Sequence, residues 1–217
     1  MSEHLTEEEQ VEAIKRWWKE NGGAIMIGIV LGLGAIIGVR YWFSYQETRA
    51  IAASDAYNRF TESAHKKEGA TTQTLANEML DKYKGTSYAA LTALQLAKQN
   101  VDANQLAEAE KHLRWALENP GDKSIALVVR LRLAVVLSAE GKLDEALSVL
   151  DKVKDPTFDP RYSEVRGDIL RKQGKLEKAR EAYQLALTDP TLSDKQREFI
   201  EMKMEDLPKP PTQESKK

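Results

Sequence analysis

The stretch LRLAVVLSAEGKLDEALSVL (131–150) contains two apolar runs of helical period on either side of a short polar turn. Apolar residues recur three and four positions apart in each run, and Gly141 between the runs tolerates a tight turn. The pattern predicts two helices that fold back on each other. The stretch VRGDILRKQGKLEKAREAYQLALTDP (165–190) repeats it, with Gly174 at the turn and Pro190 after the second helix. A helix pair is therefore the expected repeating unit.

Small and apolar residues recur along the chain at intervals of 33, 37 and 33 residues in four columns. The columns are Ala76, Ala109, Ala146 and Ala179; Leu80, Leu113, Leu150 and Tyr183; Tyr83, Ala116, Val153 and Ala186; and Ala64, Ala97, Ala134 and Gly167. Asn104 occupies the turn position of Gly141 and Gly174. The first unit departs most, because Thr71 stands at its turn position. The columns predict an all-α array of three to four helix pairs.

A period near 34 residues, two helices per unit, small residues at the helix contact and proline after the second helix together resemble the tetratricopeptide repeat. Ser193 and Gln196 match a capping box that opens a last helix, which carries Phe199, Ile200, Met204 and Leu207. Such a helix covers the exposed end of a repeat array. We therefore predict a tetratricopeptide-repeat-like α-solenoid at 67–207 with a C-terminal capping helix, followed by a disordered tail at 208–217.

An uncharged apolar run, GGAIMIGIVLGLGAIIGV (22–39), interrupts a chain whose mean hydropathy is only −0.53. As a helix, this run would be about 27 Å long, close to the hydrocarbon thickness of a bilayer. A cleavable signal peptide would have a shorter apolar core followed by a cleavage site with small residues. We predict a single transmembrane helix at 22–43 with interface anchors at Trp17, Trp18, Arg40, Tyr41 and Trp42.

Basic residues are slightly more frequent before the apolar run than after it, which predicts a cytoplasmic N-terminus and an exported C-terminal domain. The segment 1–21 is predicted to be a cytoplasmic amphipathic segment. No helix breaker occurs in 44–66, which is predicted to be an extension helix leading into the repeat domain. Either the membrane helix continues unbroken into this extension, or a hinge at 44–48 separates the two.

Four glycines of the run form two G-x-x-x-G pairs, which point to widely separated sides of the helix, namely Gly28 with Gly32 and Gly34 with Gly38. Faces of this kind let membrane helices approach closely. A homodimer through the glycine faces and contact with a larger membrane partner are both open. The alternative is a plain tether, since glycine is common in membrane helices.

Composition and motifs argue against several classes of function. Residues 44–217 are balanced, with 28 Lys and Arg against 28 Asp and Glu, after the four basic and six acidic residues of 1–43 are taken from the totals of 32 and 34. A nucleic-acid-binding protein would need a basic surplus. Cysteine is absent, and His4, His65 and His112 have no partners at ligand spacing. We therefore expect no enzyme, no cofactor and no metal site.

In a repeat array the first helix of each unit lines a concave surface that binds peptides or proteins. Counting from the small-residue columns, the inward-facing positions are Leu91, Leu94, Lys98, Val101, Val128, Leu131, Val135, Ser138, Arg161, Glu164, Asp168 and Arg171. The set grades from apolar to charged, which would suit an extended or unfolded polypeptide. Alternatively, the apolar members are covered by the helix at 44–66 and belong to the core.

The segment VEAIKRWWKENGGAIMIGIVLGLGAIIGVRYW (11–42), joined to this repeat domain, is similar to the YfgM family of Gram-negative bacteria. The resemblance implies an inner-membrane protein with a cytoplasmic N-terminus and a periplasmic repeat domain, ancillary to the SecYEG translocon. It also implies association with a PpiD-type periplasmic chaperone and contact with newly translocated polypeptides. Two functions follow as alternatives: a chaperone or adaptor for unfolded or nascent exported chains, or a scaffold that joins membrane partners without binding clients.

Overall fold

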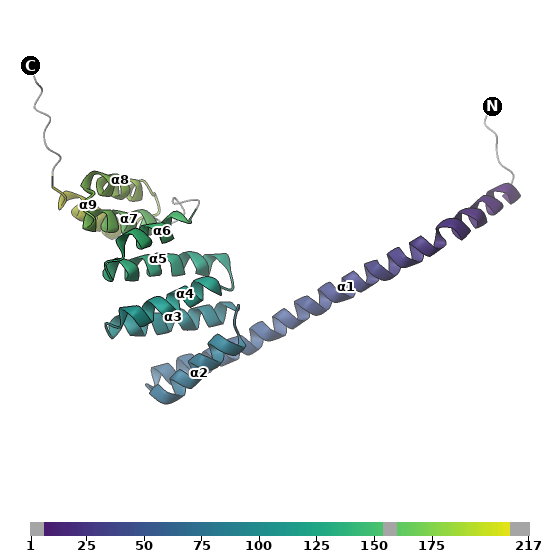
Figure 1. Ribbon diagram of the computed structural model, residues 1–217, viewed down its shortest axis with the longest axis horizontal. Helices are drawn as coiled ribbons and strands as arrows, with labels where there is room; N and C mark the ends of the chain where they lie inside the picture. Colours follow the sequence, from purple (N-terminus) through teal and green to yellow (C-terminus); the bar gives the residue numbers. More distant parts are fainter. Residues whose placement is uncertain (1–6, 154–159, 209–217) are drawn as a thin grey trace, which may run out of the picture. The chain divides into compact units, whose positions relative to one another are not determined.

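The computed structural model describes residues 7–153 and 160–208, and every regular element within them is an α-helix (Figure 1). The long first helix, α1, spans Glu7–His65. The others are α2 (Gly69–Lys82), α3 (Ser87–Asp102), α4 (Leu106–Glu118), α5 (Lys123–Ala139), α6 (Leu143–Asp151), α7 (Pro160–Lys172), α8 (Leu176–Leu187) and α9 (Asp194–Glu205). The predicted all-α class is confirmed. The predicted tail, beyond Pro208, lies outside the described residues.

The chain divides into two compact units, and the first ends at Ala52. Within α1, Gln10–His65 contains the one candidate membrane span among the described residues, judged by length and composition alone. The anchors Trp17, Trp18, Tyr41 and Trp42 are exposed. A Cβ added at Gly28, Gly32, Gly34 or Gly38 would have open space around it. The alternative hinge at 44–48 is helical.

The second unit, which begins at Ala53, is a stack of helix pairs closed by α9. The end of α1 packs with α2 and α3, where Phe60, Ala76 and Leu96 form a buried cluster. Next come the pairs α3 with α4, α5 with α6 and α7 with α8, and each of these pairs contacts its neighbour along the chain. The predicted array of helix pairs is therefore confirmed.

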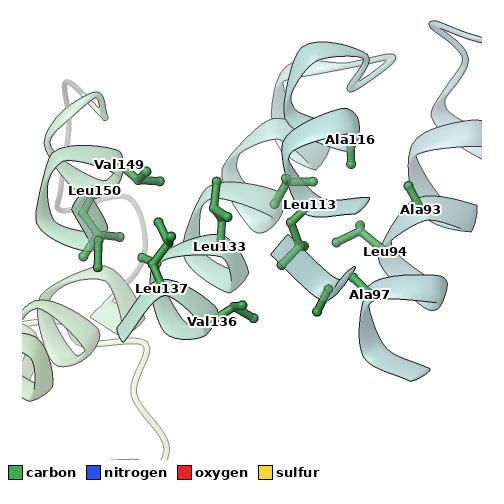
Figure 2. Close-up of a cluster of buried hydrophobic side chains, with 14 of the residues drawn as sticks. Ala93, Leu94, Ala97, Leu113, Ala116, Leu133, Val136, Leu137, Val149 and Leu150 are labelled. Atoms are coloured by element: carbon green, nitrogen blue, oxygen red, sulfur yellow. The ribbon is translucent and has the colours of Figure 1, made fainter. Parts of the chain in front are cut away.

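The core between the pairs is continuous from α3 to α7 and is made mainly of alanine, leucine and valine. Figure 2 shows its central part, where side chains of α3, α4, α5 and α6 meet. Small residues on the first helix of a pair recur 16 positions before large residues on the second, as in Ala97 with Leu113 and Ala134 with Leu150. All four are buried.

The last pair, α7 with α8, keeps this spacing, but its residue on the first helix is smaller and its residue on the second helix is larger. Tyr183 replaces leucine, and Gly167 replaces alanine 16 positions earlier. A Cβ at Gly167 would lie 2.6 Å from Cδ1 of Tyr183, so only glycine leaves room for the larger ring.

The turns within pairs are at the predicted places in three units. Asn104, Gly141 and Gly174 have φ of 58°, 81° and 75°. The prediction for the first unit was wrong. Its turn residue with positive φ is Lys67 (φ 58°), and Thr71 lies inside α2. This turn comes four residues before the predicted position. Ala64 is therefore only half-buried, whereas Ala97, Ala134 and Gly167 of the same column are buried.

The capping helix α9 begins as predicted, with reciprocal capping-box hydrogen bonds between Ser193 and Gln196. Ile200 and Leu207 are buried against Tyr183 and its neighbours, which closes the array. Phe199, expected on the same covering face, is instead 49% exposed. Its ring lies 4.7 Å from Nζ of Lys203.

Successive pairs are also joined at their loops. Asp122 caps α5 by accepting hydrogen bonds from the backbone N–H groups of Ser124 and Ile125, and its side chain accepts a third from Ser87 Oγ at 3.2 Å. Next to it, Gly121 has φ +73°, and a Cβ there would overlap the backbone of Ser87 and lie 2.6 Å from the carbonyl carbon of Thr86. The loop before α5 thus touches the loop before α3.

We expect Gly121→Ala to lower the free energy of unfolding by about 2–4 kcal/mol, because a positive φ is strained for alanine and the new Cβ meets backbone. Gly141→Ala is the matched control: its φ is +81°, but open space surrounds the site, so only about 1 kcal/mol should be lost. Urea unfolding of the full chain in detergent, followed by circular dichroism, measures both. Equal losses would contradict the loop contact.

An ion-pair network crosses from α4 to α6 on the outside of the stack. Glu110 accepts hydrogen bonds from Arg114 Nε and Lys142 Nζ, both at 2.6 Å, and Arg114 also pairs with Glu145. Partial burial raises the pKa of Glu110, but the hydrogen bonds from Lys142 and Arg114 outweigh this and lower the pKa to about 2. The network therefore favours the ionised carboxylate.

Because the folded pKa of Glu110 lies below its ordinary value of 4.5, the stabilisation should be complete above pH 4.5 and fade as the pH falls toward 2. Glu110→Gln should therefore cost about 1 kcal/mol of unfolding free energy at pH 7, with little difference left at pH 2.5. Urea titrations at both values test this, with Glu198→Gln on α9 as an exposed control. A loss of the same size at both pH values would be inconsistent with the network.

Candidate functional site

Two adjoining cavities lie between α3 and α5, with volumes of about 510 and 300 Å³. The larger is lined by Tyr57, Leu91, Leu94, Gln95, Lys98, Ser124, Ile125, Val128 and Arg132. The smaller is lined by Leu94, Ala97, Lys98, Val101, Leu113, Arg132, Val135 and Val136. Leu94, Lys98 and Arg132 line both. We call the two cavities together the α3–α5 groove.

The groove follows from the helical periodicity of α3 and α5, which are the first helices of two neighbouring pairs. On α3, Leu91, Lys98 and Val101 lie seven and three positions apart and share one face. On α5, Val128 and Val135 repeat this spacing. Three valines stay substantially exposed, Val101 at 42%, Val128 at 39% and Val135 at 48%. The groove thus presents apolar side chains that the described part of the repeat domain leaves uncovered.

Two predicted groove positions belong mainly to the core. Leu94 is only 5% exposed, and Figure 2 shows its side chain pointing into the buried cluster toward Leu113. Leu131, the repeat equivalent of Leu94, is half-buried, packs against the same cluster and lines neither cavity. The alternative that the apolar positions are core residues therefore holds for these two leucines and not for the exposed valines.

The helix at 44–66 borders the groove without covering it. Among the described residues of this segment, Tyr57 alone lines either cavity of the groove. Its ring is tilted against that of Tyr88, with centroids 5.7 Å apart, and burial raises the pKa of its hydroxyl. Tyr57 therefore forms a wall at one end of the groove.

The charged positions of α7 lie apart from the groove. Lys203 of α9 binds Glu164 at 2.6 Å and Asp168 at 2.8 Å, and Tyr183 donates a hydrogen bond to Asp168. Burial, followed by this hydrogen bond, raises the pKa of Tyr183. These two carboxylates therefore tie α7 to α8 and α9. Arg161 and Arg171 are exposed and line neither cavity.

The remaining predicted position, Ser138, is buried beneath α7. Lys172 donates hydrogen bonds to its carbonyl and hydroxyl oxygens, both at 3.1 Å. The groove found by geometry therefore contains six of the predicted residues, Leu91, Leu94, Lys98, Val101, Val128 and Val135. It does not extend along α7.

Sequence reasoning missed eight lining residues, namely Tyr57, Gln95, Ala97, Leu113, Ser124, Ile125, Arg132 and Val136. A signal for two of them was present. Gln95 and Arg132 lie 37 positions apart, and each follows an inward-facing residue, Leu91 or Val128, by four positions. Residues four apart share a helix face, so this column could have been included.

The groove offers burial and positive charge to a ligand. Lys98 and Arg132 are its charged lining residues, and the rest are apolar or neutral. Within 10–153 and 160–208, no group of three or more His, Asp or Glu side chains is placed to hold a metal ion. What the lining can do is hold a polypeptide segment by apolar contact and ion pairing.

Comparison with known proteins places this architecture in a family. A family model described as a tetratricopeptide repeat-like domain matches residues 15–209. A protein of Escherichia coli named ancillary SecYEG translocon subunit is 35% identical over 95% of this chain and 99% of its own length. Proteins of the same name from Haemophilus influenzae and Neisseria gonorrhoeae are each 30% identical over 95% of this chain and 100% of their own length. The chain therefore belongs to the family of ancillary SecYEG translocon subunits with a tetratricopeptide-repeat-like domain.

Proposed function

We propose that this chain is a non-catalytic inner-membrane protein that associates with the SecYEG translocon and acts as a chaperone or adaptor for newly translocated polypeptides. The observation that carries the proposal is the similarity over 95% of the chain to proteins named as ancillary subunits of that translocon. The α3–α5 groove supports the second half of the proposal, because it presents exposed valines to a passing chain.

The membrane arrangement is part of the proposal. The apolar run 22–39 crosses the inner membrane once, with the N-terminus in the cytoplasm and the repeat domain in the periplasm. Lys15, Arg16 and Lys19 before the run support this direction. In this position the groove would be on the side where translocated chains emerge.

The proposed partners follow from two features, the open glycine faces of the membrane helix and the hand-over of clients from the groove. The open faces at Gly28 with Gly32 and Gly34 with Gly38 leave room for another membrane helix, from SecYEG, from a PpiD-type chaperone or from a second copy. Clients handed on from the groove would need such a chaperone nearby.

The groove itself runs about 15 Å along α3 from Leu91 to Val101, enough for roughly five residues of extended chain.

Protease added to intact spheroplasts should digest the repeat domain without lysis, because the proposed orientation exposes it outside the inner membrane. An epitope on the repeat domain and one at the N-terminus report the two sides by immunoblotting. The N-terminal epitope should survive until detergent is added. Digestion of the repeat domain only after lysis would reverse the orientation.

A photocrosslinking residue at Val128 or Val135 should capture unfolded or nascent exported chains in cells, because both side chains are exposed in the groove. Val128→Asp with Val135→Asp should reduce client capture at least several-fold while the melting temperature stays unchanged. Met202→Asp is the matched control, since Met202 is an exposed apolar residue (49%) on α9 outside the groove.

Crosslinks to one fixed partner, with no exported chains captured, would instead support a scaffold that joins membrane partners without binding clients. Replacing Leu94 or Leu131 cannot separate the two functions. Both pack in the core, so a charge there would unfold the domain whichever function is right.

A further inference from the structure

The α3–α5 groove has its positive charge at one place, the junction of its two cavities. Lys98 and Arg132 line both cavities, together with Leu94. Tyr57, Leu91, Ile125 and Val128 make the larger cavity mainly apolar, and Val101, Val135 and Val136 do the same for the smaller. Neither cavity has an Asp or Glu among its described lining residues. The groove is therefore two apolar compartments with two cations between them.

Both cations are available to a ligand. Arg132 is exposed and forms no ion pair or hydrogen bond with any other described residue. Lys98 Nζ lies 2.6 Å from Asp102 Oδ2, but these side chains are 69% and 61% exposed, and Asp102 is one helical turn away on the same helix. Such exposed pairs are weak in water, so a ligand carboxylate can replace Asp102 as the partner of Lys98.

The size of the groove limits how a chain can occupy it. In an extended segment, side chains at positions i−2, i and i+2 point to the same side, and the outer two are about 13 Å apart. The groove is about 15 Å long on α3, from Leu91 to Val101, and Lys98 lies between these ends. Three side chains on one face of an extended chain therefore match apolar compartment, cation pair and apolar compartment.

We propose that the groove recognises an extended segment with the pattern apolar–x–acidic–x–apolar in an exported chain. The side-chain carboxylate of the central Asp or Glu pairs with Arg132 and Lys98, and the two apolar side chains enter the flanking compartments. This inference rests on the proposed function and states which segments of a client are bound. The pattern reads the same in both chain directions, so it requires no fixed orientation of the client.

The test uses the full chain in detergent micelles and fluorescent peptides that are acetylated and amidated, so that no terminal carboxylate contributes. The central sequence is leucine–serine–glutamate–serine–leucine between short glycine–serine flanks, with glutamine or lysine at the centre in two further peptides. Fluorescence anisotropy should show the glutamate peptide binding about tenfold tighter than the glutamine peptide, with the lysine peptide weakest. Added salt should narrow these differences.

Arg132→Glu should remove the preference for glutamate and favour the lysine peptide. Lys195→Glu makes the same charge change at an exposed position of α9 outside the groove and should leave the preference unchanged. Since both side chains are exposed, circular dichroism should show unchanged helix content and melting temperature for the two variants.

The outcomes separate this inference from the proposed function. Equal binding of the three peptides would mean that the groove binds chains without reading charge, which overturns the inference and leaves the proposed function standing. A glutamate preference that survives Arg132→Glu would put the recognition elsewhere and also overturn it. If no peptide binds, both the inference and the client-binding part of the proposed function fail.

Discussion

The close approach of two helices within each pair is the constraint on which the repeat domain depends. A small residue on the first helix lies 16 positions before a large one on the second, as Ala97 and Leu113 do, and both belong to one buried cluster. Gly167 and Tyr183 keep this fit with a larger ring and a smaller partner. Because α4 contacts both α3 and α5, its packing also sets the separation of those two helices. The width of the α3–α5 groove is therefore a consequence of how tightly the pairs close.

Local signals made most of the fold predictable. Asn104, Gly141 and Gly174 tolerate positive φ, and the pair Ser193 and Gln196 satisfies both partners of a capping box, so each marks its position without reference to the rest of the chain. The turn of the first unit was missed because Lys67 carries no such signal.

That unit is also held differently from the others. Ser63 of α1 and Thr72 of α2 share a buried hydrogen bond of 2.8 Å at the contact between the two helices. Neither residue stands in one of the four columns from which the repeat was recognised, so the columns did not predict this contact.

The groove was only partly predictable, because periodicity gives the face of a helix but not what later covers that face. Glu164 and Asp168 have the spacing of groove residues, yet Lys203 reaches them from α9, 39 and 35 positions further along the chain. A local sequence pattern cannot predict a contact between residues that lie so far apart along the chain. Arg132 was missed because its neighbour Leu131 was predicted to face the groove, whereas Leu131 packs against the core.

Leu94 belongs to both the core and the groove: it is 5% exposed and yet lines both cavities. A change there would alter folding together with the proposed binding, whereas changes at Val101, Val128, Arg132 or Val135 would alter an exposed surface alone. Under the proposed function, substitutions on the rim would therefore change the ligand preference of this chain, while the floor is kept by the requirement to fold. The same division lets an engineer redesign what the groove accepts without redesigning the protein that holds it.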